Sequence, residues 1–364
     1  MSINKDKVLQ ILSEIKHPEK RQSIVELGMI ENLEVSGKKV SFLLKTQKTK
    51  DPFAASLLKT AEAVIKNEYE DAEVSASVFS PPQVDVKPDD PLGKVKNIIA
   101  VASGKGGVGK STVAVNLAVA MAKTGATVGL IDADVYGPST PMMFGLEGQR
   151  PQVRTEGQKE IIIPIEKHGV KVVSIGFFVR PQDALVWRGP MATNALKQLI
   201  SQSDWGELDY LFIDLPPGTG DVHLTMVQET AVTGAVIVST PQQVALADAV
   251  KGIAMFTGEK INVPVLGLIE NMSWFTPAEL PENKYYIFGK EGVKKLADEM
   301  QVNLLGQIPL VQSIREDGDE GRPSVLDEQN PASKAFDELA LNLIDAVDKR
   351  NKEKEPTKRV QINH

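Results

Sequence analysis

A glycine-rich segment that directly follows an apolar run is the feature that most restricts the fold of this chain. Residues 103–112 read S-G-K-G-G-V-G-K-S-T, and they come straight after Ile98–Val101. Glycines lack a Cβ atom, so successive backbone N–H groups in such a segment can turn inward around an anion. A buried strand, a glycine-rich turn and a helix in this order therefore predict a phosphate-binding loop.

The pattern G-x-x-x-x-G-K-[ST] gives individual residues of this loop a role. We expect Lys110 to reach the β- and γ-phosphates of a nucleotide, and Ser111 to place its hydroxyl on Mg²⁺. The start of the following helix adds the positive end of its dipole. The predicted nucleotide-binding residues of the loop are Gly104, Lys105, Gly106, Gly107, Val108, Gly109, Lys110, Ser111 and Thr112.

Charge and cysteine content exclude several kinds of site and partner. The 364-residue chain has a net charge of −7 and lacks any apolar run near the ~20 residues of a membrane span. Its first residues, Met1–Lys7, do not resemble a secretory signal, so we expect a cytoplasmic protein without nucleic-acid or membrane partners. The absence of cysteine excludes disulfides, thiolate nucleophiles and cysteine-ligated metal sites. The four histidines are scattered singly and predict no metal cage.

Residues 1–80 are predicted to form a small α/β domain. Apolar residues at helical spacing predict helices over Lys5–Ile15 and Pro52–Lys66. Short apolar segments predict strands at Ile30–Val35, Val40–Leu44 and Glu73–Phe79. Residues 81–95 contain several prolines and acidic residues, which predict a semi-extended linker.

Residues 96–350 are predicted to form an α/β domain of the P-loop NTPase type, with a mostly parallel, doubly wound sheet. Nearly continuous apolar strands alternate with helices there, which implies a sheet buried on both faces. The predicted strands are Ile98–Ala102, Val128–Ile131, Tyr210–Ile213, Ala235–Ser239 and Val265–Ile269, and the helices include Ser111–Lys123, Val222–Ala231 and Leu246–Thr257. Residues 146–185 are expected to form an inserted hairpin or an edge element, and residues 351–364 a charged, frayed tail.

Two carboxylates follow the predicted strand Val128–Ile131, at the edge where ligands of such sheets bind. We expect Asp134 to orient the water molecule that attacks the γ-phosphate, and Asp132 to support the metal shell. The alternative is that these aspartates cap a helix or lie in solvent.

Another carboxylate, Asp214, ends the predicted strand Tyr210–Ile213 and is expected to hold Mg²⁺ through water. After it, Pro216 and Pro217 stiffen the chain, whereas Gly218 and Gly220 leave it free to swing. This composition predicts a loop that senses the γ-phosphate.

Lys105 is an extra lysine inside the loop, on the outward side of its turn. There it is poorly placed for the phosphates of its own chain and well placed for those of a facing subunit. The sequence therefore predicts a homodimer that sandwiches ATP, with Lys105, Lys110 and Asp134 as its catalytic residues. The alternative is an exposed lysine without this role.

Three segments together resemble the deviant-loop ATPases of the MinD/ParA class: S-G-K-G-G-V-G-K-S-T, D-A-D-V-Y-G-P-S and D-L-P-P-G-T-G-D. Within that class the chain resembles the Mrp/ApbC-type iron–sulfur cluster carriers. The segments that carry this closer resemblance are Trp187–Met191, Thr240–Asp248, Lys251–Phe256 and Glu270–Ser273. It covers about residues 92–345, and the first 80 residues resemble a small domain that the same carriers share with iron–sulfur assembly factors.

This resemblance implies a homodimer that hydrolyses ATP with Mg²⁺ and delivers iron–sulfur clusters to apoproteins, in contact with assembly factors. It also implies that Asn271 recognises adenine and that Pro309 lies against the base.

The sequence departs from the carrier pattern at the cluster ligands. Where the carriers have C-P-x-C after E-N-M-S, this chain has Thr276-Pro277-Ala278-Glu279, and Asp51 stands where their small domain has a cysteine. An iron–sulfur cluster normally needs thiolate ligands. Three interpretations stay open: unusual oxygen ligands, an ATPase without cluster chemistry, or cluster assembly with thiols from a partner.

Three functions compete on this sequence. The first is a nucleotide-switched ATPase that assists the assembly or transfer of iron–sulfur clusters. The second is a MinD/ParA-like regulatory or positioning ATPase, for which an amphipathic C-terminal helix would argue, whereas Lys349–Lys358 is charged without an apolar face. The third is a small-molecule kinase or synthetase, which would need a substrate pocket that has no signature in the sequence.

Overall fold

The computed structural model describes residues 3–18, 20, 22–46, 53–69, 71–79, 91–157, 159–178, 189–277, 279–280 and 282–360. The chain divides into two compact units, residues 1–86 and residues 87–364, and each is described by itself. Asp51, Trp187 and residues 81–90 of the predicted linker lie outside the described residues.

The first unit is a three-stranded sheet with two helices, as the sequence predicts. Its elements are α1 (Lys5–Ser13), β1 (Ile30–Ser36), β2 (Lys39–Lys45), α2 (Ala54–Glu68) and β3 (Glu73–Phe79). β1 and β2 form an antiparallel hairpin, and β3 pairs parallel to β2 because α2 forms the connection between them. The core is built from α1, β2 and α2 and includes Val8, Leu12, Phe42, Leu44, Leu57 and Ile65.

The second unit contains a sheet of eight strands in the order β13-β12-β11-β4-β10-β5-β9-β8. Neighbours pair parallel, except β8 with β9. The strands are β4 (Val95–Ala102), β5 (Val128–Asp132), β8 (Ile165–Lys167), β9 (Val170–Ser174), β10 (Leu208–Asp214), β11 (Gly234–Ser239), β12 (Val265–Glu270) and β13 (Leu304–Gln307). The predicted mostly parallel sheet is thus confirmed.

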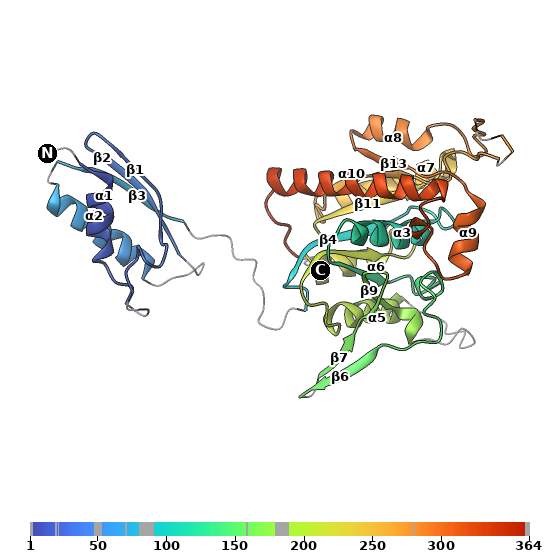
Figure 1. Ribbon diagram of the computed structural model, residues 1–364, viewed down its shortest axis with the longest axis horizontal. Coiled ribbons are helices and arrows are strands. Elements are labelled where there is room, and N and C mark those ends of the chain that lie inside the picture. The colour runs from blue at the N-terminus through green and yellow to red at the C-terminus, as the bar shows by residue number, and fades with distance from the viewer. Residues whose placement is uncertain are drawn as a thin grey trace. The chain divides into compact units, whose positions relative to one another are not determined.

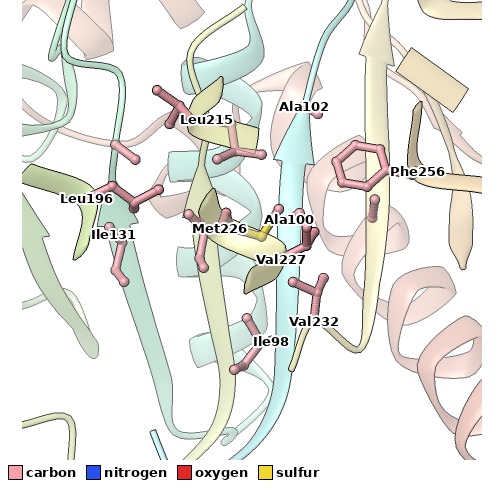
Figure 2. Close-up of a cluster of buried hydrophobic side chains, with 14 of the residues drawn as sticks. Ile98, Ala100, Ala102, Ile131, Leu196, Leu215, Met226, Val227, Val232 and Phe256 are labelled. Carbon is pink, nitrogen blue, oxygen red and sulfur yellow. The ribbon is translucent and has the colours of Figure 1, made fainter. Parts of the chain in front are cut away.

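Helices cover both faces of this sheet, because alternate residues of each central strand point to opposite sides. Ile98 and Ala100 of β4 join one core cluster, whereas Ile99 and Val101 join another. The first cluster packs against α5 (Gly189–Ser201), α6 (Asp221–Glu229), α7 (Gln243–Thr257) and α8 (Gly292–Met300), and the second against α3 (Lys110–Lys123) and α10 (Pro331–Glu353). Figure 2 shows Met226 and Val227 of α6 beside Ala100 in the first cluster. The doubly wound architecture is confirmed.

The described part of residues 146–185, which leaves out residue 158 and residues 179–185, contributes both a hairpin and an edge element. β6 (Gln152–Glu156) and β7 (Lys159–Ile163) pair antiparallel and project from the unit (Figure 1). β8 then forms the antiparallel edge of the main sheet. The remaining short elements are α4 (Thr140–Met143), α9 (Gln312–Asp319) and the 3₁₀ turns η1 (Ile175–Phe177) and η2 (Ser324–Leu326).

The expectation of a frayed tail from Asn351 is wrong for the described residues, because α10 continues to Glu353 and the chain then docks. The guanidinium of Arg350 donates to the Glu355 carbonyl at 2.9 Å and to the Thr357 hydroxyl at 2.5 Å. The Val360 amide donates to Val227 of α6 at 2.9 Å, and its side chain packs on the first core cluster. Hydrogen bonds and one apolar contact therefore fix a segment whose charge alone suggested fraying.

No helix in the described parts of the chain is both long enough and apolar enough to cross a membrane.

Candidate phosphate-binding site

The glycine-rich loop runs from Ser103 to Gly109, between the carboxyl end of β4 and the start of α3. Gly104 packs so closely on α7 that a Cβ atom there would lie 2.1 Å from the Asp248 carbonyl oxygen. Gly109 has a φ of +79°, in the left-handed region that favours glycine. A Cβ atom at Gly109 would also lie 2.3 Å from the Asn271 amide nitrogen. The glycines thus let the loop bend tightly between α7 and the end of β12.

Lys110 lies at the centre of a buried charge cluster. Its Nζ is 2.6 Å from Asp214 Oδ1, 3.7 Å from Asp134 Oδ2 and donates to Ser111 Oγ at 3.1 Å. The Lys110 side chain is 6% exposed and Asp214 is fully buried. The structure therefore brings together Lys110, Ser111, Asp134 and Asp214, which come from the start of α3 and from the ends of two neighbouring strands, β5 and β10.

The two carboxylate oxygens of Asp214 differ in their hydrogen bonding. Oδ1 accepts from Lys110, whereas Oδ2 is buried without a hydrogen-bond partner in the described part of the chain. Burial raises the pKa of Asp214, and the Lys110 ammonium opposes that rise. Buried polar atoms are almost always paired, so this oxygen is suited to a ligand contact. A carboxylate oxygen beside the Ser111 hydroxyl is the donor chemistry that hydrated Mg²⁺ prefers.

Asp132 holds the loop that carries Asp134. Its Oδ1 accepts from the Asp134 amide at 3.2 Å, and its Oδ2 accepts from the Thr140 amide at 3.2 Å and from Ser174 Oγ at 2.8 Å. Burial and the neighbouring Asp214 carboxylate raise the pKa of Asp132 to about 7. Asp132 thus caps the start of α4, as the alternative interpretation proposed, and its predicted support of a metal shell stays a prediction.

The predicted sensor loop connects β10 to α6. It is tied to the phosphate-binding loop by the Gly218 amide, which donates to the Ser103 carbonyl at 2.9 Å. His223 lies in the first turn of α6, directly after the sensor loop, and is 1% exposed. Neither ring nitrogen has a hydrogen-bond partner among the described residues, and burial lowers the pKa of His223 to about 4. No spacing or neighbouring motif distinguishes this histidine from the other three along the chain.

A cavity of about 260 Å³ opens beside the loop, along the first two turns of α3. Gly109, Thr112, Asn271 and Pro309, all predicted nucleotide contacts, lie on its wall. The Asn271 amide donates to the Val108 carbonyl at 2.8 Å, which fixes its position against the loop. Most of the remaining wall is apolar and comes from α3, α4, α9, α10 and the segment after β13, with Val115, Met142, Met143, Leu310, Val311, Ile314 and Phe336. Such an apolar site suits a nucleoside base.

Lys105 stands apart from this cluster. Its side chain is exposed and makes no ion pair with any residue that the structure describes. Its backbone carbonyl accepts from the Ser103 hydroxyl at 3.0 Å, which fixes the turn from which the side chain extends. Within a single chain, Lys105 is therefore separate from Lys110 and the aspartates.

The segment with Thr276 and Glu279 forms a braced surface loop. Phe275 makes single β-bridges to Tyr285 and Leu310, and the Lys284 ammonium lies 3.9 Å from the ring centroid of Trp274. Glu279 is exposed, and within the described ranges no three histidine, aspartate or glutamate side chains gather as a metal site. A hydroxyl and one exposed carboxylate do not match the thiolate set of an iron–sulfur cluster.

Comparisons with known proteins agree with the two-unit architecture. The family model described as NUBPL iron-transfer P-loop NTPase matches residues 94–344, and the one described as iron-sulfur cluster assembly protein matches residues 5–78. An iron-sulfur cluster carrier protein from Synechocystis is 45% identical over 345 residues, which span 94% of this chain and 97% of that protein.

Two solved structures are also similar. A nucleotide-binding protein from Archaeoglobus fulgidus in complex with ADP is 38% identical with a TM-score of 0.57, and the match covers 69% of this chain and 97% of that one. The cell division ATPase MinD from Pyrococcus furiosus is 23% identical with a TM-score of 0.50, over 68% of this chain and 98% of that one. The second likeness concerns the fold alone.

Proposed function

This chain belongs to the NUBPL iron-transfer P-loop NTPase family, and we propose that it hydrolyses ATP to assist the assembly or transfer of iron–sulfur clusters. The observation that carries the proposal is the buried cluster in which Lys110 lies between Asp214 and Asp134, next to a base-sized cavity that Gly109 and Thr112 line. The alternative of a regulatory or positioning ATPase is not favoured, because the model matched over residues 94–344 is that of an iron-transfer NTPase.

Binding of the triphosphate starts with an exchange of partners. Backbone N–H groups of the loop surround the phosphates, and Lys110 turns from Asp214 to the β- and γ-phosphates, which carry more negative charge. This exchange leaves both Asp214 oxygens free, beside the Ser111 hydroxyl, to hold the water shell of Mg²⁺. When bound, Mg²⁺ neutralises charge that develops on the phosphate oxygens.

Hydrolysis needs a water molecule in line with the bond that breaks. Asp134, which is 13% exposed and held by its hydrogen bonds to Asp132 and Tyr136, is the carboxylate in reach of such a water. The water oxygen adds to the γ-phosphorus, the bond to the bridging oxygen of ADP breaks, and the water proton ends on the released phosphate. Loss of the γ-phosphate then frees the loops at Asp134 and Gly218, which changes the surface that partners meet.

A second copy of the chain completes this site in our proposal. Lys105 extends from a fixed turn into solvent and cannot join the charge cluster of its own chain. In a dimer that faces two loops toward each other, its ammonium meets the phosphates of the partner subunit's nucleotide. ATP then links the two copies, and hydrolysis weakens that link.

The iron–sulfur cluster is cargo for which this chain supplies no thiolate. It contains no cysteine, and Thr276 and Glu279 stand at the positions of the carrier ligands. Of the three interpretations we favour assembly with thiols from a partner, because the family match persists over both units while the soft ligands are absent. The chain would then drive, with ATP, the transfer between a cysteine-bearing scaffold and a client apoprotein.

The test combines phosphate release with cluster transfer under anaerobic conditions. The chain is mixed with a cysteine-bearing scaffold loaded with iron and sulfide and with an apoenzyme that requires a [4Fe–4S] cluster. We expect Mg²⁺-dependent phosphate release and faster recovery of the apoenzyme with ATP than without it, whereas Lys110→Met abolishes both. The chain alone with iron and sulfide should develop no visible absorbance. Transfer that is equally fast without this chain or without ATP would overturn the proposal.

A further inference from the structure

The cavity beside the phosphate-binding loop contains one buried polar atom without a partner. Ser324, in η2, lines the cavity and is 1% exposed, and its hydroxyl has no hydrogen-bond partner among the described residues. The hydroxyl of an unexposed serine lost its water on folding, so an unpaired one costs stability. Such an atom is retained at a cost unless a ligand or an ordered water molecule pairs with it.

The other buried amides on the cavity wall are already paired. Asn116 donates to the Thr112 carbonyl at 2.9 Å and accepts from the Val325 amide at 3.0 Å. Asn271 donates its side-chain amide to the Val108 carbonyl. Ser324 is therefore the lining residue whose side chain has a fully buried polar atom without a hydrogen-bond partner in the described part of the chain.

The backbone next to Ser324 is fixed from two helices. Besides the bond from its amide to Asn116, Val325 accepts at its carbonyl from Lys123 Nζ at 3.0 Å and from the Ser333 hydroxyl at 3.1 Å. α3 and α10 thus hold η2 in place. Because the backbone of this segment is already fixed, a ligand that bonds to the hydroxyl need not order the segment first.

The size and chemistry of the cavity select its occupant. Its volume of about 260 Å³ is below the roughly 300–1,000 Å³ of sites for whole drug-sized ligands, which fits one base rather than an entire nucleotide. Gly109 and Thr112 connect it to the loop where the phosphates of the proposed nucleotide bind. The apolar walls of the cavity suit the two faces of a purine. The polar edge of the purine then needs a hydrogen-bond partner inside the cavity.

We propose that Ser324 is a specificity-determining residue whose hydroxyl forms a hydrogen bond with the edge of the adenine base, at the 6-amino group or at N7. This inference rests on the proposed binding of ATP and adds a contact that no motif in the chain indicates. It also predicts that one substitution has opposite effects on stability and on affinity. Ser324→Ala removes an unpaired polar atom from the free protein, which should not lower its stability. In the complex with ATP the same substitution removes a paired atom, which should weaken binding.

The test is a cycle that alters the protein and the ligand together. Wild type and Ser324→Ala are titrated by calorimetry with ATP, with purine riboside triphosphate, which lacks the 6-amino group, and with 7-deaza-ATP, which lacks N7. We expect Ser324→Ala to weaken ATP binding by about three- to tenfold. The loss should disappear with whichever analogue lacks the bonded group, because that partner is already absent.

Ser203→Ala serves as the matched control, since Ser203 is also 1% exposed and its hydroxyl donates to the Leu199 carbonyl, away from the cavity wall. It should leave the ratios among the three nucleotides unchanged. Thermal melting of the nucleotide-free protein should show Ser324→Ala at least as stable as wild type, and Ser203→Ala less stable.

Equal weakening of all three nucleotides by Ser324→Ala, or weakening of none, overturns the inference. Because only binding is measured, a protein that binds ATP but fails in hydrolysis or cluster transfer contradicts the proposed function and not this contact. A wild type that binds none of the three nucleotides contradicts both.

Discussion

Lys110 Nζ and Asp214 Oδ1 lie 2.6 Å apart in a pocket where the aspartate is fully buried. Removing either charge from such a pair leaves the other uncompensated, so the pair holds the loop in shape without nucleotide. The same geometry makes Asp214 a competitor of the phosphates for the Lys110 ammonium. The site changes from its nucleotide-free to its nucleotide-bound form when the ammonium moves from Asp214 to the phosphates.

Lys110→Met removes the charge that the phosphates require while it keeps a chain of similar length. A charge-assisted hydrogen bond contributes about 1.5–3 kcal/mol, so we expect ATP to bind at least tenfold more weakly by calorimetry. Lys251→Met is the control, because Lys251 is exposed and pairs with Asp248 on the surface of α7. Affinities of Lys110→Met within twofold of wild type would refute the exchange of partners.

Lys105→Ala tests whether the outward lysine acts across a dimer. We expect wild type to sediment as a dimer with ATP and Mg²⁺ and as a monomer without nucleotide, whereas Lys105→Ala stays monomeric in both. ATP binding to the single chain should change little, because Lys105 lies outside the charge cluster. Lys66→Ala, which removes an exposed lysine from α2, should dimerise like wild type. An unchanged ATP-dependent dimer of Lys105→Ala would contradict the role of this residue.

Two glycines of the loop give a matched pair for stability. A Cβ at residue 104 would lie 2.1 Å from the Asp248 carbonyl oxygen, whereas at residue 106 the nearest atom, of Pro217, is 3.8 Å away. Overpacking against backbone costs about 1–3 kcal/mol, so Gly104→Ala should lower the free energy of unfolding by that amount. Gly106→Ala should differ by less than about 0.5 kcal/mol. Urea unfolding of both variants checks this, and equal stabilities would mean that α7 yields to the added atom.

The phosphate-binding loop and Asp214 were predictable because their information is local. The spacing of glycines and Lys110 defines the turn, and an apolar strand that ends in aspartate places Asp214 at the same edge of a parallel sheet. The predicted sheet follows from alternating apolar strands and helices for the same reason.

Residues whose role depends on distant partners could not be assigned from the sequence. The carboxylate of Asp132 is fixed in part by Ser174, at the end of β9, which donates a hydrogen bond to it from a distant part of the chain. His223 is buried because α6 packs on the sheet near Phe256, at a ring distance of 6.5 Å. Ser324 faces the cavity because η2 is fixed between α3 and α10. None of these contacts leaves a spacing or a pattern along the chain.

His223→Leu should remove a part of the acid sensitivity of folding. The pKa of His223 is about 4 in the folded protein, against about 6.5 when exposed. The unfolded chain therefore binds more protons between these values, and stability falls as the pH drops through that range. The difference corresponds to about 3 kcal/mol at most.

Urea unfolding at pH 7 and at pH 4.5 measures this effect. Wild type should lose more stability than His223→Leu between the two pH values, whereas at pH 7, where His223 is neutral, the two proteins should be similarly stable. If both proteins lose the same stability on acidification, His223 is not held neutral by burial.

The docked end of the chain makes a final prediction, at Val360. Its side chain packs on the first core cluster and its amide bonds to α6, whose other end begins at the sensor loop. Val360→Ala removes part of a half-buried apolar contact, so we expect a loss of about 1 kcal/mol in the free energy of unfolding. Lys358→Ala, in the same segment but exposed, should change it by less than about 0.5 kcal/mol. If the end of the chain is frayed, the two variants should have equal free energies of unfolding. If it is docked, Val360→Ala should be less stable than Lys358→Ala, because only an ordered segment loses a packing contact with the core when one side chain is shortened.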